Sequence, residues 1–314
     1  MKKFLLLLIA AVSLAGCNRS PEYYFKRANY LFGKGNHMEA LQNYNKALLL
    51  RKGYVEALVS RGLLHDVQGD RQQAAQDYRK AIEINSSYLP AYNNLGALMM
   101  DGGNYKEAVR IFTDALSVKP DYTFAMLNRG LSYYKQGDCA SATADLSRAL
   151  DLNPKLELAY YHRALCAGKA KNMPAAIADL NAVLDLNPAA VAASLELGKA
   201  LYGLQDYGGA AKEFLRTLEL KPRDYFAQYW LALSFYKFGY YEGALSAALK
   251  AAELKSDSYQ ARGLLGDVYA ATGDKSAAAA EYKAAAALAP KFASFYQARL
   301  AALGATARPS RVRR

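Results

Sequence analysis

The chain has 314 residues, of which 53% are hydrophobic, and a formal net charge of +12. Its basic residues are spread along the sequence, whereas a nucleic-acid-binding protein gathers them in one patch, so we expect no nucleic-acid partner. The three histidines lie far apart without metal-ligand spacing, and no catalytic motif is present. The sequence therefore predicts neither a metal nor a cofactor, and it does not favour an enzyme.

Residues 1–16 have the three-part layout of a secretory signal peptide. Lys2 and Lys3 form a short basic region, residues 4–12 form an apolar run, and Leu-Ala-Gly precedes Cys17. The apolar run is too short to span a membrane permanently. The Leu-Ala-Gly-Cys ending resembles the lipobox of bacterial lipoproteins, which implies removal of the signal and acylation of Cys17. The alternative is an ordinary secretory signal followed by a coincidental cysteine.

Residues 17–20 would then form a lipidated N-terminus and a short tether. Several acyl chains on Cys17 would anchor the protein to a membrane without a transmembrane helix. Asn18 follows the cysteine, and in enteric bacteria the absence of Asp at this position favours sorting to the outer membrane. We therefore expect a lipid-anchored protein of the bacterial cell envelope, at the outer membrane and facing the periplasm. The inner membrane stays open as the alternative.

A unit of 34 residues recurs eight times between residues 21 and 292, without insertion or deletion. Place 20 of the unit always holds alanine, and place 8 always holds alanine or glycine. Such residues suit two helix backbones that cross with no room for a larger side chain. Because no unit can bury its apolar face alone, the array predicts a solenoid of stacked units. The eight repeats span residues 21–54, 55–88, 89–122, 123–156, 157–190, 191–224, 225–258 and 259–292.

Each repeat is predicted to form a helix, a turn and a second helix. The first helix ends at a glycine in six repeats, as at Gly137, where a positive φ closes the helix. An asparagine or aspartate follows in seven repeats, as at Asn36 and Asp138, and its side chain is expected to cap the second helix. The second helix carries a bulky residue at place 24, with Ala248 as the exception, and ends before a proline in five repeats.

This pattern resembles the tetratricopeptide repeat, and the resemblance covers residues 21–292. It implies an all-α fold: a right-handed superhelical α-solenoid whose concave groove binds peptides or proteins. Residues 293–303 repeat the start of a unit, so we expect them to form a capping helix over the exposed end of the core. Residues 304–314 are basic and lack apolar periodicity, which predicts a disordered tail.

In this family the first helix of each repeat lines the groove. Aromatic rings there can take apolar or proline side chains, amides can hold a peptide backbone, and lysines at place 13 can pair with carboxylates. The alternative is that the tyrosines only pack along the solenoid and the lysines form a solvated face. The predicted groove residues are Asn94, Phe124, Asn128, Tyr134, Lys135, Tyr161, His162, Lys169, Tyr202, Phe226, Tyr229, Trp230, Tyr236 and Lys237.

Arginine occupies place 7 in four repeats, and a short polar residue occupies place 23 of the same repeats. We expect each pair to join the two helices of its repeat, since a guanidinium near the core needs its donors satisfied. The pairs are Arg27 with Asn43, Arg61 with Asp77, Arg129 with Asp145, and Arg163 with Asp179.

Beyond Cys17 the chain has two cysteines, Cys139 and Cys166, at different levels of their repeats. A disulfide needs two Cβ atoms that face each other closely, so we expect two largely buried thiols. Export to an oxidising compartment leaves a bond between them open.

Together these patterns predict a membrane-anchored scaffold that binds a peptide or protein partner in its groove. Similar lipoproteins serve in pilus assembly, secretion, cell-wall synthesis and polysaccharide export, and the sequence does not choose among these pathways or fix the oligomeric state. The alternative is an accessory subunit that binds a polysaccharide, because aromatic walls also suit sugars. An enzyme is the least favoured reading, since few residues lie outside the repeats to carry a catalytic site.

Overall fold

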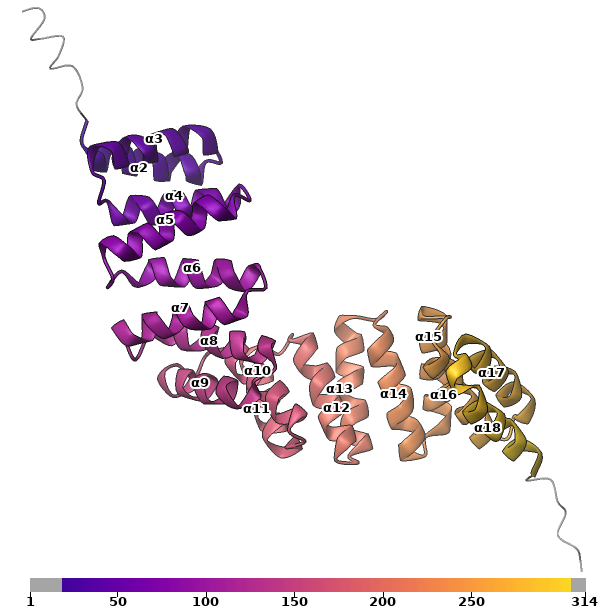
Figure 1. Ribbon diagram of the computed structural model, residues 1–314. Helices are drawn as coiled ribbons and strands as arrows, with labels where there is room; N and C mark the ends of the chain where they lie inside the picture. The colour runs from indigo at the N-terminus through magenta and orange to yellow at the C-terminus, as the bar shows by residue number, and fades with distance from the viewer. Residues whose placement is uncertain (1–18, 306–314) are drawn as a thin grey trace, which may run out of the picture. The chain divides into compact units, whose positions relative to one another are not determined.

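The computed structural model describes residues 19–305, and every regular element in that range is helical: 17 α-helices and one 3₁₀ helix (Figure 1). The prediction of an all-α fold is confirmed. Residues 1–16, Cys17 and most of the basic tail lie outside the described residues. In the described range, no helix combines the length and the apolar character that a membrane crossing requires.

The chain divides into two compact units, which are described separately. The N-terminal unit runs to Pro154 and holds the helices of repeats one to four. Its helices are α2 (Pro21–Gly33), α3 (His37–Leu50), α4 (Val55–Val67), α5 (Arg71–Ile84), α6 (Leu89–Asp101), α7 (Tyr105–Val118), α8 (Thr123–Gln136) and α9 (Cys139–Leu152).

The C-terminal unit starts at Lys155 and holds the helices of repeats five to eight and the residues that follow. Its helices are α10 (Glu157–Lys169), α11 (Met173–Leu186), α12 (Val191–Gly203), α13 (Tyr207–Leu220), α14 (Tyr225–Phe238), α15 (Tyr241–Leu254), α16 (Tyr259–Thr272), α17 (Lys275–Leu288), η1 (Pro290–Phe292) and α18 (Ala293–Ala305).

Within each unit the helices follow one packing rule. The two helices of a repeat pack on each other, and the second helix packs on the first helix of the next repeat, as α7 does on α8 and α13 on α14. First helices of neighbouring repeats also meet, such as α4 with α6 and α14 with α16. We call the surface made by the first helices of a unit its first-helix face, and the surface made by the second helices its second-helix face.

The small residue at place 8 makes room for the bulky side chain at place 24. A Cβ atom added to Gly96 would lie 2.4 Å from the ring of Phe112, and one added to Gly198 would lie 2.6 Å from Phe214. The nearest neighbour of place 8 is thus a side chain, and not the crossing backbone that we expected. Alanine at place 20 is buried throughout, as Ala142 illustrates with no exposed area.

The turn inside each repeat follows the expected chemistry with one exception. Gly137 has φ +86°, and its N–H donates to Tyr134 while Asp138 donates to Tyr133, which closes α8. The Asp138 carboxylate then accepts a bond from the Ser141 N–H and caps α9. Asn36 was expected to cap α3 in the same way, but its amide donates to the Glu39 carboxylate and it makes no side-chain cap.

Three of the four predicted arginine pairs are formed. Each guanidinium donates two hydrogen bonds to its aspartate: Arg61 to Asp77 at 2.6 and 2.8 Å, Arg129 to Asp145 at 2.7 Å twice, and Arg163 to Asp179 at 2.7 and 2.8 Å. The hydrogen bonds to Asp145 also raise the pKa of Arg129, so the guanidinium stays charged.

The fourth pair, Arg27 with Asn43, was predicted wrongly. Arg27 is exposed, and the Asn43 amide donates to the Glu39 carbonyl oxygen at 2.7 Å. An amide oxygen carries no net charge, so it attracts a guanidinium less strongly than the aspartates of the other repeats do.

The arginines also reach across repeats. A third donor of Arg61 bonds Asn45 on α3 at 2.6 Å, and a third donor of Arg129 bonds Thr113 on α7 at 3.1 Å. Both acceptors belong to the second helix of the preceding repeat. The arginine therefore lies in the seam between two consecutive second helices and ties three helices together.

Repeat six keeps the carboxylate of this arrangement without the arginine. Glu213 stands at place 23, but Leu197 stands at place 7. The Oε2 atom of Glu213 is buried and accepts no hydrogen bond from any described residue. Arg216 Nη1 lies 3.8 Å away, which allows an ion pair but is too far for a hydrogen bond.

The last helix, α18, packs on α17. Tyr296 is buried, its ring stacks on Tyr282 with centroids 6.3 Å apart, and its hydroxyl donates to the Tyr259 carbonyl at 3.2 Å. Elsewhere in the described range, Cys139 is half-buried and Cys166 buried, and the two are not bonded to each other.

Candidate functional site

The structure divides the fourteen predicted groove residues between the two units, all on first helices. Five belong to the N-terminal unit: Asn94 on α6, and Phe124, Asn128, Tyr134 and Lys135 on α8. Nine belong to the C-terminal unit: Tyr161, His162 and Lys169 on α10, Tyr202 on α12, and Phe226, Tyr229, Trp230, Tyr236 and Lys237 on α14. Their role in binding stays a prediction.

Two of the residues in the N-terminal unit, Phe124 and Asn128, contact neighbours outside the predicted set. Phe124 is 61% exposed and its ring lies 6.0 Å from that of Tyr122. The Asn128 amide donates to the Asn93 side chain of the preceding repeat at 3.4 Å, whereas Asn94 is the next residue along α6. The amides thus join across repeats, although not through the pair that shares place 6.

The three lysines have a structural explanation beside the predicted one. Lys135, Lys169 and Lys237 are exposed and lie in the last turns of α8, α10 and α14. A cation is favoured there by the partial negative charge of a helix C-terminus. Gly203 occupies the same place on α12, so the lysine column is interrupted inside the C-terminal unit.

Tyr161 and His162 hold each other on α10. Their ring centroids are 5.3 Å apart in an edge-to-face arrangement. The His162 Nδ1 atom lies 2.9 Å from the Leu158 carbonyl oxygen, one turn earlier in the same helix. Both side chains are half-buried, so each presents part of its ring to solvent.

The largest aromatic cluster of this face surrounds Trp230, and we define the Trp230 cluster as Tyr202, Tyr225, Tyr229 and Trp230. Trp230 meets Tyr202 edge to face at 5.2 Å and Tyr229 at 6.0 Å, and Tyr229 stacks on Tyr225 at 6.2 Å. Trp230 also stacks on Phe214, which is fully buried. The cluster is therefore half-buried, anchored on the core, and open to solvent on one side.

Further phenols surround Tyr229. Burial first, and then the nearby phenols of Tyr225, Tyr202, Tyr296 and Tyr259, raise the pKa of Tyr229 to about 12. Tyr259 comes from α16 and Tyr296 from α18. Sequence reasoning missed both, because they stand at places 1 and 4, which the family pattern does not assign to the groove. Tyr225, also at place 1, was the available signal.

Phe226 adds an exposed ring beside the cluster. It is 57% exposed, and its centroid lies 5.2 Å from that of Tyr225. It stands at place 2, as Phe124 does in the other unit. Tyr236 lies near the C-terminal end of α14, and its ring centroid is 5.9 Å from that of Tyr241 on α15. The rings in contact on this face thus extend from Tyr202 on α12 to Phe226 on α14.

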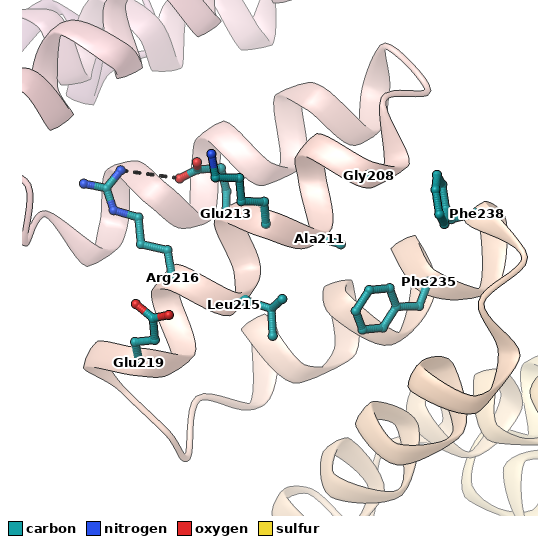
Figure 2. Close-up of a pocket in the computed structure, with 9 residues that line it drawn as sticks. Gly208, Ala211, Glu213, Leu215, Arg216, Glu219, Phe235 and Phe238 are labelled. Atoms are coloured by element: carbon teal, nitrogen blue, oxygen red, sulfur yellow. Dashed lines mark ion pairs between the residues drawn. The ribbon is translucent and has the colours of Figure 1, made fainter.

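A pocket on the other side of the same repeats was not predicted. It has a volume of about 660 Å³ and opens between α13 and the end of α14. Figure 2 shows Leu215 of α13 and, from α14, Phe235 and Phe238, and the Glu213–Arg216 ion pair also lines the pocket. A second hollow of about 580 Å³ shares Leu215 and Phe235 and continues to α15.

The sequence signal for this pocket lies in repeat seven. The place of the arginine, place 7, holds Leu231. The places of its two partners hold Ala247 at place 23 of the same repeat and Leu215 at place 25 of the preceding repeat. All three line the second hollow. The seam that an arginine fills elsewhere is therefore apolar and partly empty here.

The family model described as tetratricopeptide repeat matches residues 25–88, 93–156, 127–191, 167–225, 195–259 and 231–291. No curated protein sequence is significantly similar to the chain.

Several solved structures are similar in fold. Pseudomonas aeruginosa pilF is 21% identical, with a TM-score of 0.58 over 68% of this chain and 97% of its own. A tetratricopeptide repeat protein from Parabacteroides merdae is 22% identical, with a TM-score of 0.55 over 80% of this chain and 98% of its own. YrrB, a TPR protein with an unusual peptide-binding site, is 22% identical, with a TM-score of 0.52 over 59% of this chain and 95% of its own. At these identities the likeness concerns the fold alone.

Proposed function

The chain belongs to the tetratricopeptide repeat family, whose members generally act as non-catalytic scaffolds for protein or peptide partners, and from this premise we propose that it binds such a partner on the first-helix face of its C-terminal unit. The observation that carries the proposal is the Trp230 cluster. Its rings are packed against one another and against the buried Phe214, so they lose little freedom when a partner covers them.

The chemistry of the face suits an extended segment with apolar or proline side chains. Tyrosine and tryptophan offer large, rigid contact areas and a polar atom at the edge of each ring, and binding energy concentrates on such residues. Phe226 extends this surface toward solvent, and Lys237 places a cation at the end of α14. An acidic residue of the partner near Lys237 would add a contact that salt weakens.

The partner can be identified by capture with the intact chain from membranes, followed by mass spectrometry. Trp230 is the only tryptophan of the chain, so its fluorescence should change when the captured partner binds. Phe226→Ala should weaken binding by about 2 kcal/mol, as expected for an aromatic anchor. Phe124→Ala is the matched control, because Phe124 has the same place and similar exposure in repeat four.

Equal affinities for Phe226→Ala and Phe124→Ala would place the binding surface elsewhere. Capture of a polysaccharide in place of a protein, with the same Trp230 response, would favour the accessory polysaccharide-binding role instead.

We further propose that the scaffold is anchored at the outer membrane, facing the periplasm, through lipid on Cys17, and serves an envelope complex. The Leu-Ala-Gly-Cys sequence supports the anchor. The first described helix begins at Pro21, and Ser20 caps it by accepting a bond from the Tyr23 N–H. The array would therefore start only a few residues from the lipid.

Labelled palmitate should be incorporated into the wild type and not into Cys17→Ala. That variant should leave the membrane fraction or keep its signal peptide. An unlabelled wild type would refute the anchor.

A further inference from the structure

The second-helix face of repeats six and seven carries an apolar surface that packing within the chain does not cover. Leu215 on α13, Phe238 at the end of α14 and Tyr240 before α15 are 44%, 65% and 48% exposed. They surround the two connected hollows between α13, α14 and α15. Exposed apolar patches beside a hollow mark interaction surfaces in soluble proteins.

This surface lies in the seam that an arginine fills in repeats two and four, and repeat seven has no arginine there. In repeats two and four the guanidinium contacts an aspartate of its own repeat and a polar residue of the preceding second helix. In repeat seven Leu231, Ala247 and Leu215 stand at those three places, and all three line the hollow. Repeat seven is also the one repeat without a bulky residue at place 24, where it has Ala248.

The charges around this surface are balanced and symmetrically spaced along α15. Glu242 and Lys250 both border the hollow and both are exposed. Ser246 lies midway between them in the sequence, and the adjacent residues that border the hollow, Gly243 and Ala247, are small. When such a helix packs antiparallel on a second copy of itself across Ser246, Glu242 of each copy faces Lys250 of the other. Ser246, at the crossing itself, is small and exposed, which allows the two helices to approach closely.

We propose that this surface, made by α13, the end of α14 and α15, pairs with the same surface of a second copy of the chain. A two-fold dimer uses one patch on both subunits, so the patch must complement itself in shape and charge. The exposed apolar side chains beside the hollow supply contact area, and the Glu242 and Lys250 positions meet the charge requirement. The Trp230 cluster and Phe226 line neither hollow and take no part in this contact.

The test is the mass of the full-length chain in solution, in a Cys17→Ala background that removes any lipid contribution. Analytical ultracentrifugation over a micromolar dilution series should show a dimer. Leu215→Glu should convert it to a monomer, because a carboxylate would enter the apolar contact. Phe226→Glu is the matched control: Phe226 is 57% exposed on the first-helix face, so that variant should stay dimeric. Circular dichroism verifies that each variant remains helical.

Charge reversal tests the two-fold arrangement. Lys250→Glu should weaken the dimer by about tenfold or more, since each interface would hold two pairs of facing carboxylates. Adding Glu242→Lys to the same chain should restore the dimer, because every facing pair regains opposite charges.

A monomeric wild type overturns the proposal, as does a dimeric Leu215→Glu variant or a double reversal that stays weak. If the wild type is monomeric and Leu215→Glu loses a protein captured from membranes, the surface binds another protein and the second-copy proposal is wrong. Trp230 fluorescence reports the partner of the first-helix face separately, so either proposal can fail without the other.

Discussion

The Arg129–Asp145 pair allows the energetics of the repeat to be tested at one position. Arg129→Leu would leave the Asp145 carboxylate, 8% exposed, without its two hydrogen bonds of 2.7 Å. Removing one partner of a buried ion pair costs about 3–5 kcal/mol. The side chains of Arg129 and Asp145 keep 20% and 11% exposure, so water would recover part of the loss. We therefore expect a destabilisation near the lower end, about 3 kcal/mol.

The double variant Arg129→Leu with Asp145→Ile should behave differently. It copies repeat three of this chain, where Leu95 and Ile111 occupy the same two places and are buried. With no charge left in the seam, apolar packing replaces the ion pair, and we expect a stability within about 1 kcal/mol of the wild type. The difference in the free energy of unfolding between the single and the double variant measures the cost of an unpaired carboxylate.

Urea unfolding followed by far-ultraviolet circular dichroism would supply the free energies. The curves should be fitted with a nearest-neighbour model for repeats, because long arrays depart from two-state unfolding. A single variant as stable as the wild type, or a double variant as unstable as the single one, would refute the reasoning.

Other changes give further tests. Gly96→Ala should destabilise by about 1–3 kcal/mol in thermal unfolding, because its methyl group would collide with Phe112, whereas Gly168→Ala, which meets nothing within 4 Å, should not. Glu213→Leu should stabilise by about 1–3 kcal/mol by removing a buried oxygen without a donor, and a lower melting temperature would contradict this. Burial raises the pKa of Tyr229 from its ordinary 10.0 to about 12, so its neutral form stabilises the fold fully below pH 10 and that contribution is lost as the pH rises through 12. Burial also raises the pKa of Tyr44 and Tyr282 to about 12, so absorbance titration should show several late phenols, and Tyr229→Phe should lower the late absorbance change by one phenol.

The local rules of the repeat were readable in the sequence because they act over short distances. The glycine at six of the turns, the aspartate cap after Gly137 and the sixteen-residue spacing from Arg129 to Asp145 all depend on one helix hairpin. The failures, Asn36 and Arg27, both lie in repeat one. There, neutral amides bond the nearby Glu39 instead of taking the expected partners, a competition that periodicity cannot rank.

The candidate sites depend on more distant geometry. Trp230 was found because the family pattern assigns its place to the groove, but Tyr259 and Tyr296 come near Tyr229 from two further helices, α16 and α18. The hollow beside Leu215 results from side chains that are missing in repeat seven, and a missing arginine carries no motif of its own. Such a gap becomes visible only when the neighbouring repeats show what normally fills it.

The third hydrogen bond of each bridging arginine sets the scale on which the N-terminal unit unfolds cooperatively. Arg61 ties α4 and α5 to α3, and Arg129 ties α8 and α9 to α7. Repeat three has Leu95 in the corresponding place, so no such bridge connects it backward to repeat two. In a one-dimensional Ising description, strong and weak couplings between neighbouring repeats would therefore alternate along the N-terminal unit. Amide hydrogen exchange should then protect repeats one and two as one block and repeats three and four as another, with the boundary falling between α5 and α6.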